Sequence, residues 1–136
     1  MVTVLLALAV TAGCGGDTSS PELESLRHES LASASFDGLH LRHEYERDAK
    51  GSGDTVTGKS VDAKITRVFE PDDPQRLPEY FRHVVAEAKD QGWQAKYAYP
   101  DGFTGQKTLA QGPGQIDVVL APCDSKNCLF LYLSAL

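Results

Sequence analysis

Two cysteines near the end of the chain have the spacing of a short structural crosslink. Cys123 and Cys128 enclose the polar tetrapeptide Asp-Ser-Lys-Asn, with strongly apolar segments on either side. In an oxidising compartment, a disulfide across the mouth of such a hairpin loop contributes about 2 kcal/mol in the chain-entropy model. Thioredoxin-type redox chemistry requires C-x-x-C, and structural zinc requires four ligands, so both fit this pair less well. The sequence therefore predicts a structural disulfide, with free thiols as the alternative.

The third cysteine, Cys14, follows an apolar run with the length of a signal-peptide core. The run, residues 2–13, contains no charged residue and is shorter than the roughly 20 residues that span a bilayer. An amphipathic core helix would show polar residues at regular spacing instead. Thr11-Ala12-Gly13-Cys14 resembles the lipobox of bacterial lipoproteins, in which small residues precede a cysteine that becomes lipidated and N-terminal. The resemblance implies a signal peptide over residues 1–13 and a lipid on Cys14.

The lipobox resemblance comes with two departures and sets the domain boundaries. Thr11 stands where leucine is usual, and no basic residue precedes Arg27, which would suit a translation start upstream of Met1. Residues 14–20 would form a lipidated, flexible tether, and residues 21–136 a single globular domain. Without residues 1–13 the 136-residue chain has 123 residues, enough for one core and too few for two.

The acidic composition limits the partners that the chain can have. Its formal net charge is −6, with acids and bases interspersed. A nucleic-acid partner would require a basic face, and an anionic membrane surface would repel the domain. Attachment to a membrane would depend on the lipid at Cys14, where the lipoprotein resemblance implies two or three acyl chains. We therefore expect a membrane partner through Cys14 and no nucleic acid.

One stretch matches a nucleotide-binding motif letter by letter. Residues 53–60, Gly-Asp-Thr-Val-Thr-Gly-Lys-Ser, fit the P-loop pattern G-x-x-x-x-G-K-[ST]. A phosphate cradle needs a buried strand before the loop and a helix after it. Here the half-polar residues 44–48 precede the loop, and the strand-like residues 61–65 follow it. We therefore interpret the stretch as a hairpin loop and expect no bound nucleotide.

The histidines and acids do not suggest a metal site. His40 and His43 are three residues apart on a predicted strand and so are expected on opposite faces, with His43 facing inward. His83, on a predicted helix, has no partner at ligand spacing. Three acids share one strand face with arginines nearby, an arrangement typical of a solvated surface rather than a Ca²⁺ site: Glu44, Glu46 and Asp48.

Aromatic residues offer either core packing or a binding groove for sugars or peptides. Trp93, Tyr97 and Tyr99 alternate along one predicted strand, and such spacing favours packing against a helix through Phe81 and Val85. The groove remains the alternative. Three other aromatic residues are expected to be more exposed: Tyr80, Phe103 and Tyr132.

Hydrophobic periodicity predicts one long helix and six strands. The helix runs from about Pro74 or Leu77 to Gln91, with Asp72 and Asp73 before it and Gly92 after it. A shorter helix is possible from Pro21, with Ser20 as its N-cap. The strands are expected near 39–48, 61–69, 93–99, 106–110, 116–121 and 128–133, with turns at 100–102 and 112–114.

The predicted architecture is α+β. An antiparallel sheet of five or six strands, in the sequence order β-β-α-β-β-β-β, carries the long helix on one face. The last two strands are apolar on both faces, which is typical of central, doubly covered strands. The short N-terminal helix or a partner molecule would have to cover part of the second face.

These features favour a non-catalytic exported domain that binds a protein or another envelope component. A lipobox followed by a small acidic domain resembles small actinobacterial lipoproteins of unknown function, which implies lipid anchoring at the outer face of the cell membrane. This likeness carries over only Cys14. One alternative is a small envelope hydrolase, its acid and base drawn from His43, His83 and the acids around Asp72. Another is a domain without a partner surface. The sequence assigns no catalytic residue, cofactor or metal.

Overall fold

The computed structural model describes residues 19–49 and 62–136. The predicted signal peptide 1–13, Cys14 and the motif-like stretch 53–60 lie outside these ranges. No helix within the described ranges is long and apolar enough to cross a bilayer.

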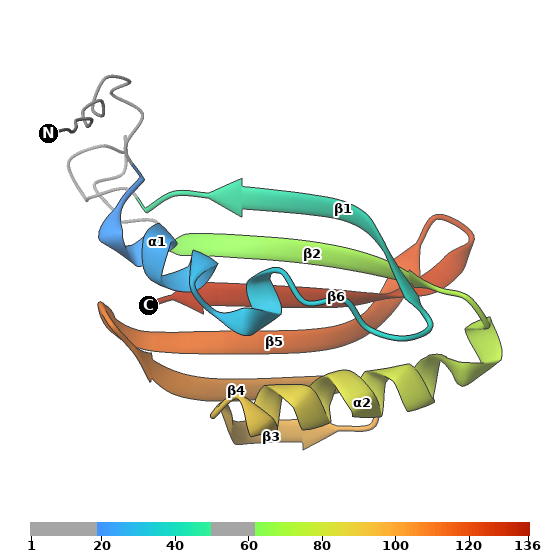
Figure 1. The fold of residues 1–136 in the computed structure, drawn as a ribbon. Coiled ribbons are helices and arrows are strands. Elements are labelled where there is room, and N and C mark those ends of the chain that lie inside the picture. Colours follow the sequence, from blue (N-terminus) through green and yellow to red (C-terminus); the bar gives the residue numbers. More distant parts are fainter. Residues whose placement is uncertain (1–18, 50–61) are drawn as a thin grey trace, which may run out of the picture.

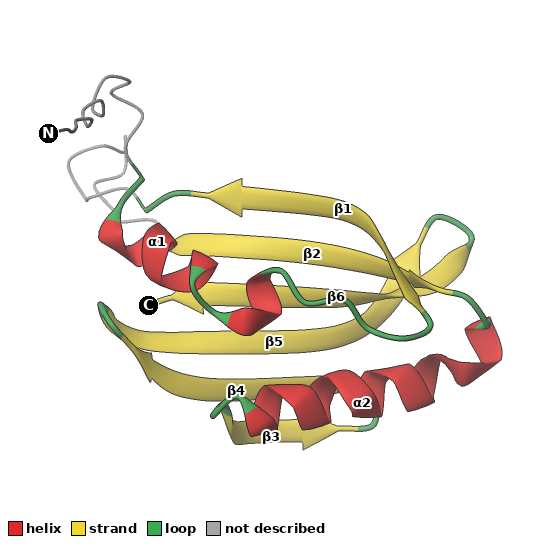
Figure 2. Cartoon of the chain, in the orientation of Figure 1, coloured by secondary structure: helices red, strands yellow, loops and turns green. Residues whose placement is uncertain are grey.

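A six-stranded antiparallel sheet forms the body of the domain, and the helices of the described residues lie on one of its faces (Figures 1 and 2). The spatial order of the strands is β1-β2-β6-β5-β4-β3. This arrangement confirms the predicted α+β class and order of elements. In chain order the elements are α1 (Pro21–Arg27), the 3₁₀ turn η2 (Ser30–Ala32), β1 (Leu39–Arg47), β2 (Ala63–Pro71), the 3₁₀ turn η4 (Pro74–Arg76), α2 (Leu77–Asp90), β3 (Gln94–Tyr99), β4 (Gly102–Leu109), β5 (Gly112–Cys123) and β6 (Lys126–Ala135).

The long helix α2 forms where the sequence predicts it. The Asp73 carboxylate accepts a hydrogen bond from the backbone N–H of Gln75 and so caps the 3₁₀ turn that leads into α2. Pro78 lies in the first turn, where no intrahelical donor is lost. Gly92 follows the helix with φ +97°, the left-handed conformation that glycine adopts readily. The helix buries one stripe against the sheet: Leu77, Tyr80, Phe81, Val84 and Ala88.

The N-terminal helix α1 is also present, with the predicted cap. The Ser20 hydroxyl accepts a hydrogen bond from the backbone N–H of Leu23, and Pro21 occupies the first helical position. However, α1 packs on the same face of the sheet as α2 (Figure 1). Leu23 and Leu26 belong to the same core cluster as the buried stripe of α2. The expectation that α1 could cover the second face of the sheet is therefore wrong.

The two strands that are apolar on both faces lie in the middle of the sheet, as predicted. β6 pairs with β2 on one side and with β5 on the other. Their helix-side residues complete the core: Ile116, Val118, Leu129, Leu131 and Leu133.

The C-terminal hairpins differ in detail from the prediction. The sequence suggested a short strand at 106–110 and a turn at 112–114. β4 instead begins at Gly102, the turn lies at residues 110–111, and Gly112 opens β5. Gly112 has φ +130°, a left-handed conformation that glycine adopts readily. This conformation allows the chain to leave the turn at a residue that already pairs with Leu109.

Two cations on the helix side of the sheet attach the helical layer to it. Arg67 is buried and donates through Nη1 to the carbonyls of Leu31, at 3.0 Å, and Ala34, at 2.7 Å. Lys107 donates through Nζ to Glu29 and to the carbonyl of Gln91, both at 2.7 Å. Burial lowers the pKa of the Arg67 guanidinium, because leaving water penalises the charged form.

Candidate functional site

The strand register places three rows of side chains on the face opposite the described helices, which we call the open face. Each row crosses all six strands from β3 to β1. The polar row is Gln94, Gln106, Gln115, Ser134, Lys64 and Arg47. The tyrosine row is Tyr97, Thr104, Asp117, Tyr132, Thr66 and Tyr45. The apolar row is Tyr99, Gly102, Val119, Phe130, Val68 and His43.

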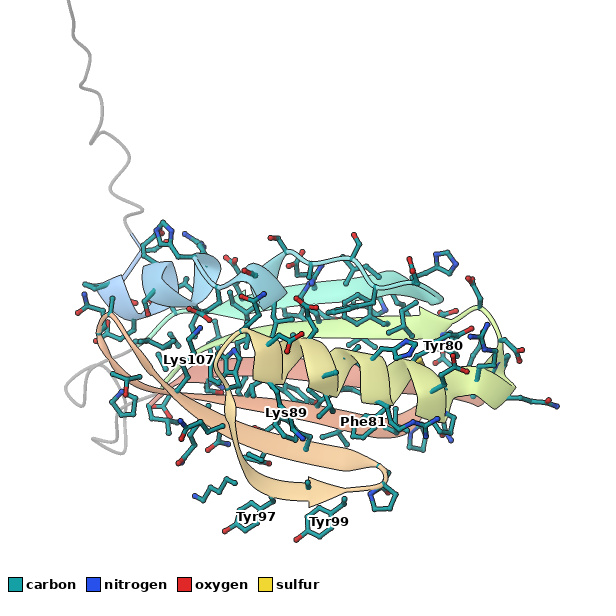
Figure 3. The ribbon with its side chains drawn as sticks, turned by 60° about the horizontal axis from the view of Figure 1, so that its bottom comes forward. Tyr80, Phe81, Lys89, Tyr97, Tyr99 and Lys107 are labelled. Carbon is teal, nitrogen blue, oxygen red and sulfur yellow. A yellow bond between two sulfur atoms is a disulfide. The ribbon has the colours of Figure 1, made fainter. Side chains whose placement is uncertain are left out.

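Aromatic side chains on the open face occur as pairs on three strands. On β6, the rings of Phe130 and Tyr132 stack with centroids 6.2 Å apart. On β1, His43 and Tyr45 stack with centroids 5.8 Å apart. The third pair, Tyr97 and Tyr99 on β3, points away from α2 (Figure 3). Tyr45, Tyr97 and Tyr99 are 58%, 52% and 63% exposed, which leaves their rings free to contact another molecule.

β-Bulges in both edge strands bring these aromatic residues to the open face. The register of β3 shifts between Ala95 and Tyr97. Before this bulge the odd-numbered residues face the helices, and after it the odd-numbered residues face the opposite side of the sheet. The expectation that Tyr97 and Tyr99 pack in the core is therefore wrong, whereas Trp93, which precedes the bulge, is buried as predicted.

The bulge in β1 changes the expected positions of two histidines. The register shifts between Leu41 and His43, so that His40 pairs with Glu70 and His43 with Val68. Both histidines consequently lie on the open side of the sheet, not on opposite faces, and His43 is exposed rather than inward-facing. The described residues contain no cluster of three or more groups that could hold a metal ion.

The polar side chains in the middle of the open face bond to one another. Thr104 donates its hydroxyl to Asp117 Oδ1 at 2.6 Å, and Gln115 donates through Nε2 to Asp117 Oδ2 at 2.9 Å. Beside them, Lys64 Nζ lies 5.3 Å from the centroid of the Tyr132 ring. The central carboxylate is thus held in a fixed position by Thr104 of the neighbouring strand β4 and by Gln115 of its own strand β5.

The acidic residues Glu44 and Glu46 of β1 and Asp48 just after it, which we call the acidic stripe, do more than contact solvent. Arg27 of α1 bonds Glu46 at 2.6 Å through Nη2, which lowers the pKa of that carboxyl. Ser20 donates to Asp48 from both its backbone N–H and its hydroxyl, and these bonds lower the pKa of Asp48. Glu44 lies 3.4 Å from Nε of the buried Arg67. The stripe therefore holds the N-terminal helix and its connection against the edge of the sheet.

The disulfide predicted between Cys123 and Cys128 is present. Their Cα atoms are 5.8 Å apart, within the usual range for this bond. The bridge closes the β5–β6 hairpin, next to the pairs Ala121↔Cys128 and Cys123↔Lys126. It fixes the end of the two central strands.

For the hydrolase alternative, the structure brings His83 and the acids around Asp72 together at one hollow. A hollow of about 430 Å³ is lined by His83 and by Asp72 and Asp73, among others. Asp72, however, bonds His40 of β1, and the described hydrogen bonds give His83 no carboxylate or hydroxyl partner. The residues are gathered without the acid–base contact that orients a catalytic histidine.

A second hollow lies between α2 and the end of β3. It has a volume of about 580 Å³ and is mostly apolar, with Phe81 and Val85 on the helix and Tyr99 on the strand. Arg82 and Lys89 also line it; Figure 3 shows Phe81 and Lys89 on α2 above the strand. The described residues offer neither cation an ion-pair partner within bonding distance.

The prediction that Tyr80 and Phe103, on the helix side, are exposed is also wrong. Tyr80 is 4% and Phe103 is 2% exposed, so both belong to the core and not to a contact surface. Tyr132 lies on the open face and is half-buried, so it is less exposed than the sequence predicted. A signal for the correct assignment of Tyr80 was available, because Leu77, Tyr80 and Val84 recur at helical spacing.

Comparison with known proteins adds no relative to this description. No family model, no curated protein and no solved structure matches the chain. The function must therefore be inferred from the geometry of the molecule itself.

Proposed function

We propose that this protein is an exported, lipid-anchored binding domain whose open face contacts a component of the cell envelope. The observation that carries the proposal is the open face itself, with exposed aromatic pairs on β1 and β3 and a third pair on β6. Large exposed aromatic side chains gathered on one surface are typical of recognition sites. The lipobox-like sequence before Cys14 supplies the anchor in this proposal.

The first experiment tests the anchor. Cells that express the full chain are compared with cells that express Cys14→Ser, and membranes are separated from soluble material. The mature protein is expected in the membrane fraction with acyl chains on Cys14 by mass spectrometry, and Cys14→Ser is expected to lose both. Ser35→Ala, at an exposed position, is the control. Absence of acyl chains from Cys14 of the wild-type protein, with equal membrane binding of Cys14→Ser, would contradict the lipid anchor.

The second experiment tests the open face. The chain from Gly15 onward, without the lipid, is sedimented with purified cell envelopes. The double variant Tyr45→Ala/Tyr97→Ala is expected to stay in the supernatant. Leu41→Ala serves as a control, because Leu41 is an exposed large residue that pairs with Phe69 on the helix side. If the double variant and the control sediment alike, the open face is not the binding surface.

The hydrolase alternative makes a separate prediction. If the hollow at Asp72 were catalytic, His83→Ala would abolish an activity of the purified protein on envelope substrates while leaving sedimentation with envelopes intact. The binding proposal expects no change from His83→Ala in either measurement.

A further inference from the structure

The spacing of the aromatic pairs on the open face suggests a repeating ligand. The pair on β6 lies three strands from the pair on β3 and two strands from the pair on β1. At about 4.8 Å per strand, these separations are about 14 Å and 10 Å. The positions between the pairs carry short side chains in the tyrosine and apolar rows: Gly102, Thr104, Asp117, Val119, Thr66 and Val68.

The chemistry of the open face fits a carbohydrate chain. A sugar ring has a face of C–H groups, which stacks on the electron-rich face of an aromatic ring. Its rim of hydroxyls both donates and accepts hydrogen bonds. The tyrosine row offers rings at Tyr97, Tyr132 and Tyr45, and between them the Thr104–Asp117 pair offers a fixed acceptor. Gln106 and Gln94 of the polar row add exposed amides, each with a donor and an acceptor.

A folded protein partner fits this surface less well. The centre of a protein interface is typically apolar and depleted of charge. The open face has few aliphatic side chains: Val68 is buried within it and Val119 is half-buried. Its middle is occupied by the Asp117 carboxylate with Thr104 and Gln115. Such a polar centre needs a ligand that can hydrogen-bond along its length.

The charge of the open face indicates which carbohydrates would bind. The chain as a whole has a net charge of −6, but the three rows contain two fixed cations, Arg47 and Lys64, against one carboxylate, Asp117. Both cations lie in the polar row, next to the aromatic pairs of β1 and β6. Because exposed cations attract anionic groups over about a Debye length, a ligand with carboxylates on this side is favoured.

We propose that the open face binds an extended polysaccharide that carries carboxylate groups, with sugar rings stacked on Tyr97, Tyr132 and Tyr45 and the carboxylates beside Lys64 and Arg47. This inference rests on the proposed function of the open face and names its ligand class. Because neighbouring strands twist by about 20–25°, a chain that crosses the face must follow this twist, which a flexible polysaccharide can do.

Affinity electrophoresis tests the inference with defined polymers. The chain from Gly15 onward is run in native gels that contain polygalacturonate, hyaluronate or uncharged dextran. We expect retardation by at least one of the carboxylated polymers and weaker retardation by dextran. The net negative charge of the protein makes non-specific attraction to these polyanions unfavourable. Retardation would therefore report a specific surface.

Variants identify the residues that bind. Tyr97→Ala and Tyr45→Ala are each expected to raise the apparent dissociation constant by about 3- to 10-fold, as loss of one aromatic stacking contact would. Lys64→Ala is expected to weaken binding to the carboxylated polymer and to leave weak binding to dextran unchanged. The matched controls are Leu41→Ala and Lys89→Ala, both exposed residues on the helix side.

Two outcomes overturn the inference: absence of retardation of the folded wild-type chain by both carboxylated polymers, or equal retardation of the wild type and the tyrosine variants. If retardation is absent but sedimentation with envelopes still depends on Tyr45 and Tyr97, the proposed function stands with a different envelope component as the partner. If sedimentation does not depend on the tyrosines either, both proposals fail.

Discussion

Some charged residues on the helix side of the sheet stabilise the fold, although their positions in the sequence do not indicate this role. Arg67 interrupts an otherwise apolar strand face that contains Ala63, Ile65 and Phe69. In the structure Arg67 lies on β2, which is not an edge strand, next to Glu44 of β1. Its guanidinium donates to the carbonyls of Leu31 in η2 and of Ala34 in the segment after it. A buried cation with such partners fixes the path of the chain between α1 and β1.

Replacing Arg67 should therefore destabilise the domain strongly. Arg67→Ala leaves the carbonyls of Leu31 and Ala34 without their donor and removes packing against the Phe69 ring, 5.0 Å away. We expect the free energy of unfolding in urea to fall by about 2–4 kcal/mol. Arg82→Ala, at an exposed position on α2, should change it by less than about 0.5 kcal/mol. Equal effects of the two substitutions would contradict the structural role.

The bonds between Ser20 and Asp48 should give the domain a specific acid sensitivity. They hold the pKa of Asp48 below its ordinary value of 3.8. A carboxyl whose pKa is lowered in the folded state contributes stability above its ordinary pKa. That contribution is lost as the pH falls through the lowered value. Below about pH 4, the free energy of unfolding of the wild type should therefore fall. That of Ser20→Ala, which lacks the hydroxyl bond to Asp48, should fall less over the same pH range.

NMR titration of the Asp48 side chain checks this linkage directly. In Ser20→Ala the pKa of Asp48 is expected to rise toward its ordinary value, and stability at neutral pH should fall by about 1 kcal/mol through loss of the α1 cap. Ser33→Ala, at an exposed position where the backbone N–H rather than the side chain makes the capping bond, to the carbonyl of Ser30, should leave the titration unchanged. An unaltered Asp48 titration in Ser20→Ala would refute the assignment.

At the scale of the elements, hydrophobic periodicity was sufficient for the architecture but not for the faces of the edge strands. Six strands, the long helix, the N-terminal helix and the central position of β5 and β6 follow from apolar spacing and turn residues. The composition of the edge strands does not reveal the bulges between Leu41 and His43 and between Ala95 and Tyr97. One inserted residue reverses which side chains face the helices without changing the residue types. The aromatic pairs that form the candidate site were consequently assigned to the wrong face or left unnoticed.

The packing of α2 allows the helix face to be tested with two neighbouring valines. Val84 is fully buried in the core, whereas Val85 lines the hollow beside β3 and is half-buried. Val84→Ala should lower the free energy of unfolding by about 2 kcal/mol, from lost apolar burial and the cavity that remains. Val85→Ala should lower it by less than about 1 kcal/mol. A larger loss for Val85 in urea denaturation would mean that the helix is rotated from its described position.

At the scale of the whole molecule, the two faces of the sheet have separate tasks. The helix side contains the core cluster, the cations Arg67 and Lys107 with their partners, and the contacts of α1 and α2. The open face contributes exposed rings and polar side chains that bond mainly to one another. A binding surface built on the face that does not support the core can change its side chains without loss of the fold, as long as the strands keep their pairing.

This separation predicts that the tyrosines needed for binding are dispensable for folding. Tyr45 and Tyr97 are more than half exposed on edge strands, so truncating each should change the free energy of unfolding by no more than about 0.5 kcal/mol. Urea denaturation of Tyr45→Ala/Tyr97→Ala should therefore give nearly the wild-type midpoint. A loss of more than about 2 kcal/mol would show that these rings stabilise the edge strands through cross-strand packing. Weaker binding by the same variant would then report damage to the fold rather than a missing contact, and the assignment of recognition to the open face would lose its support.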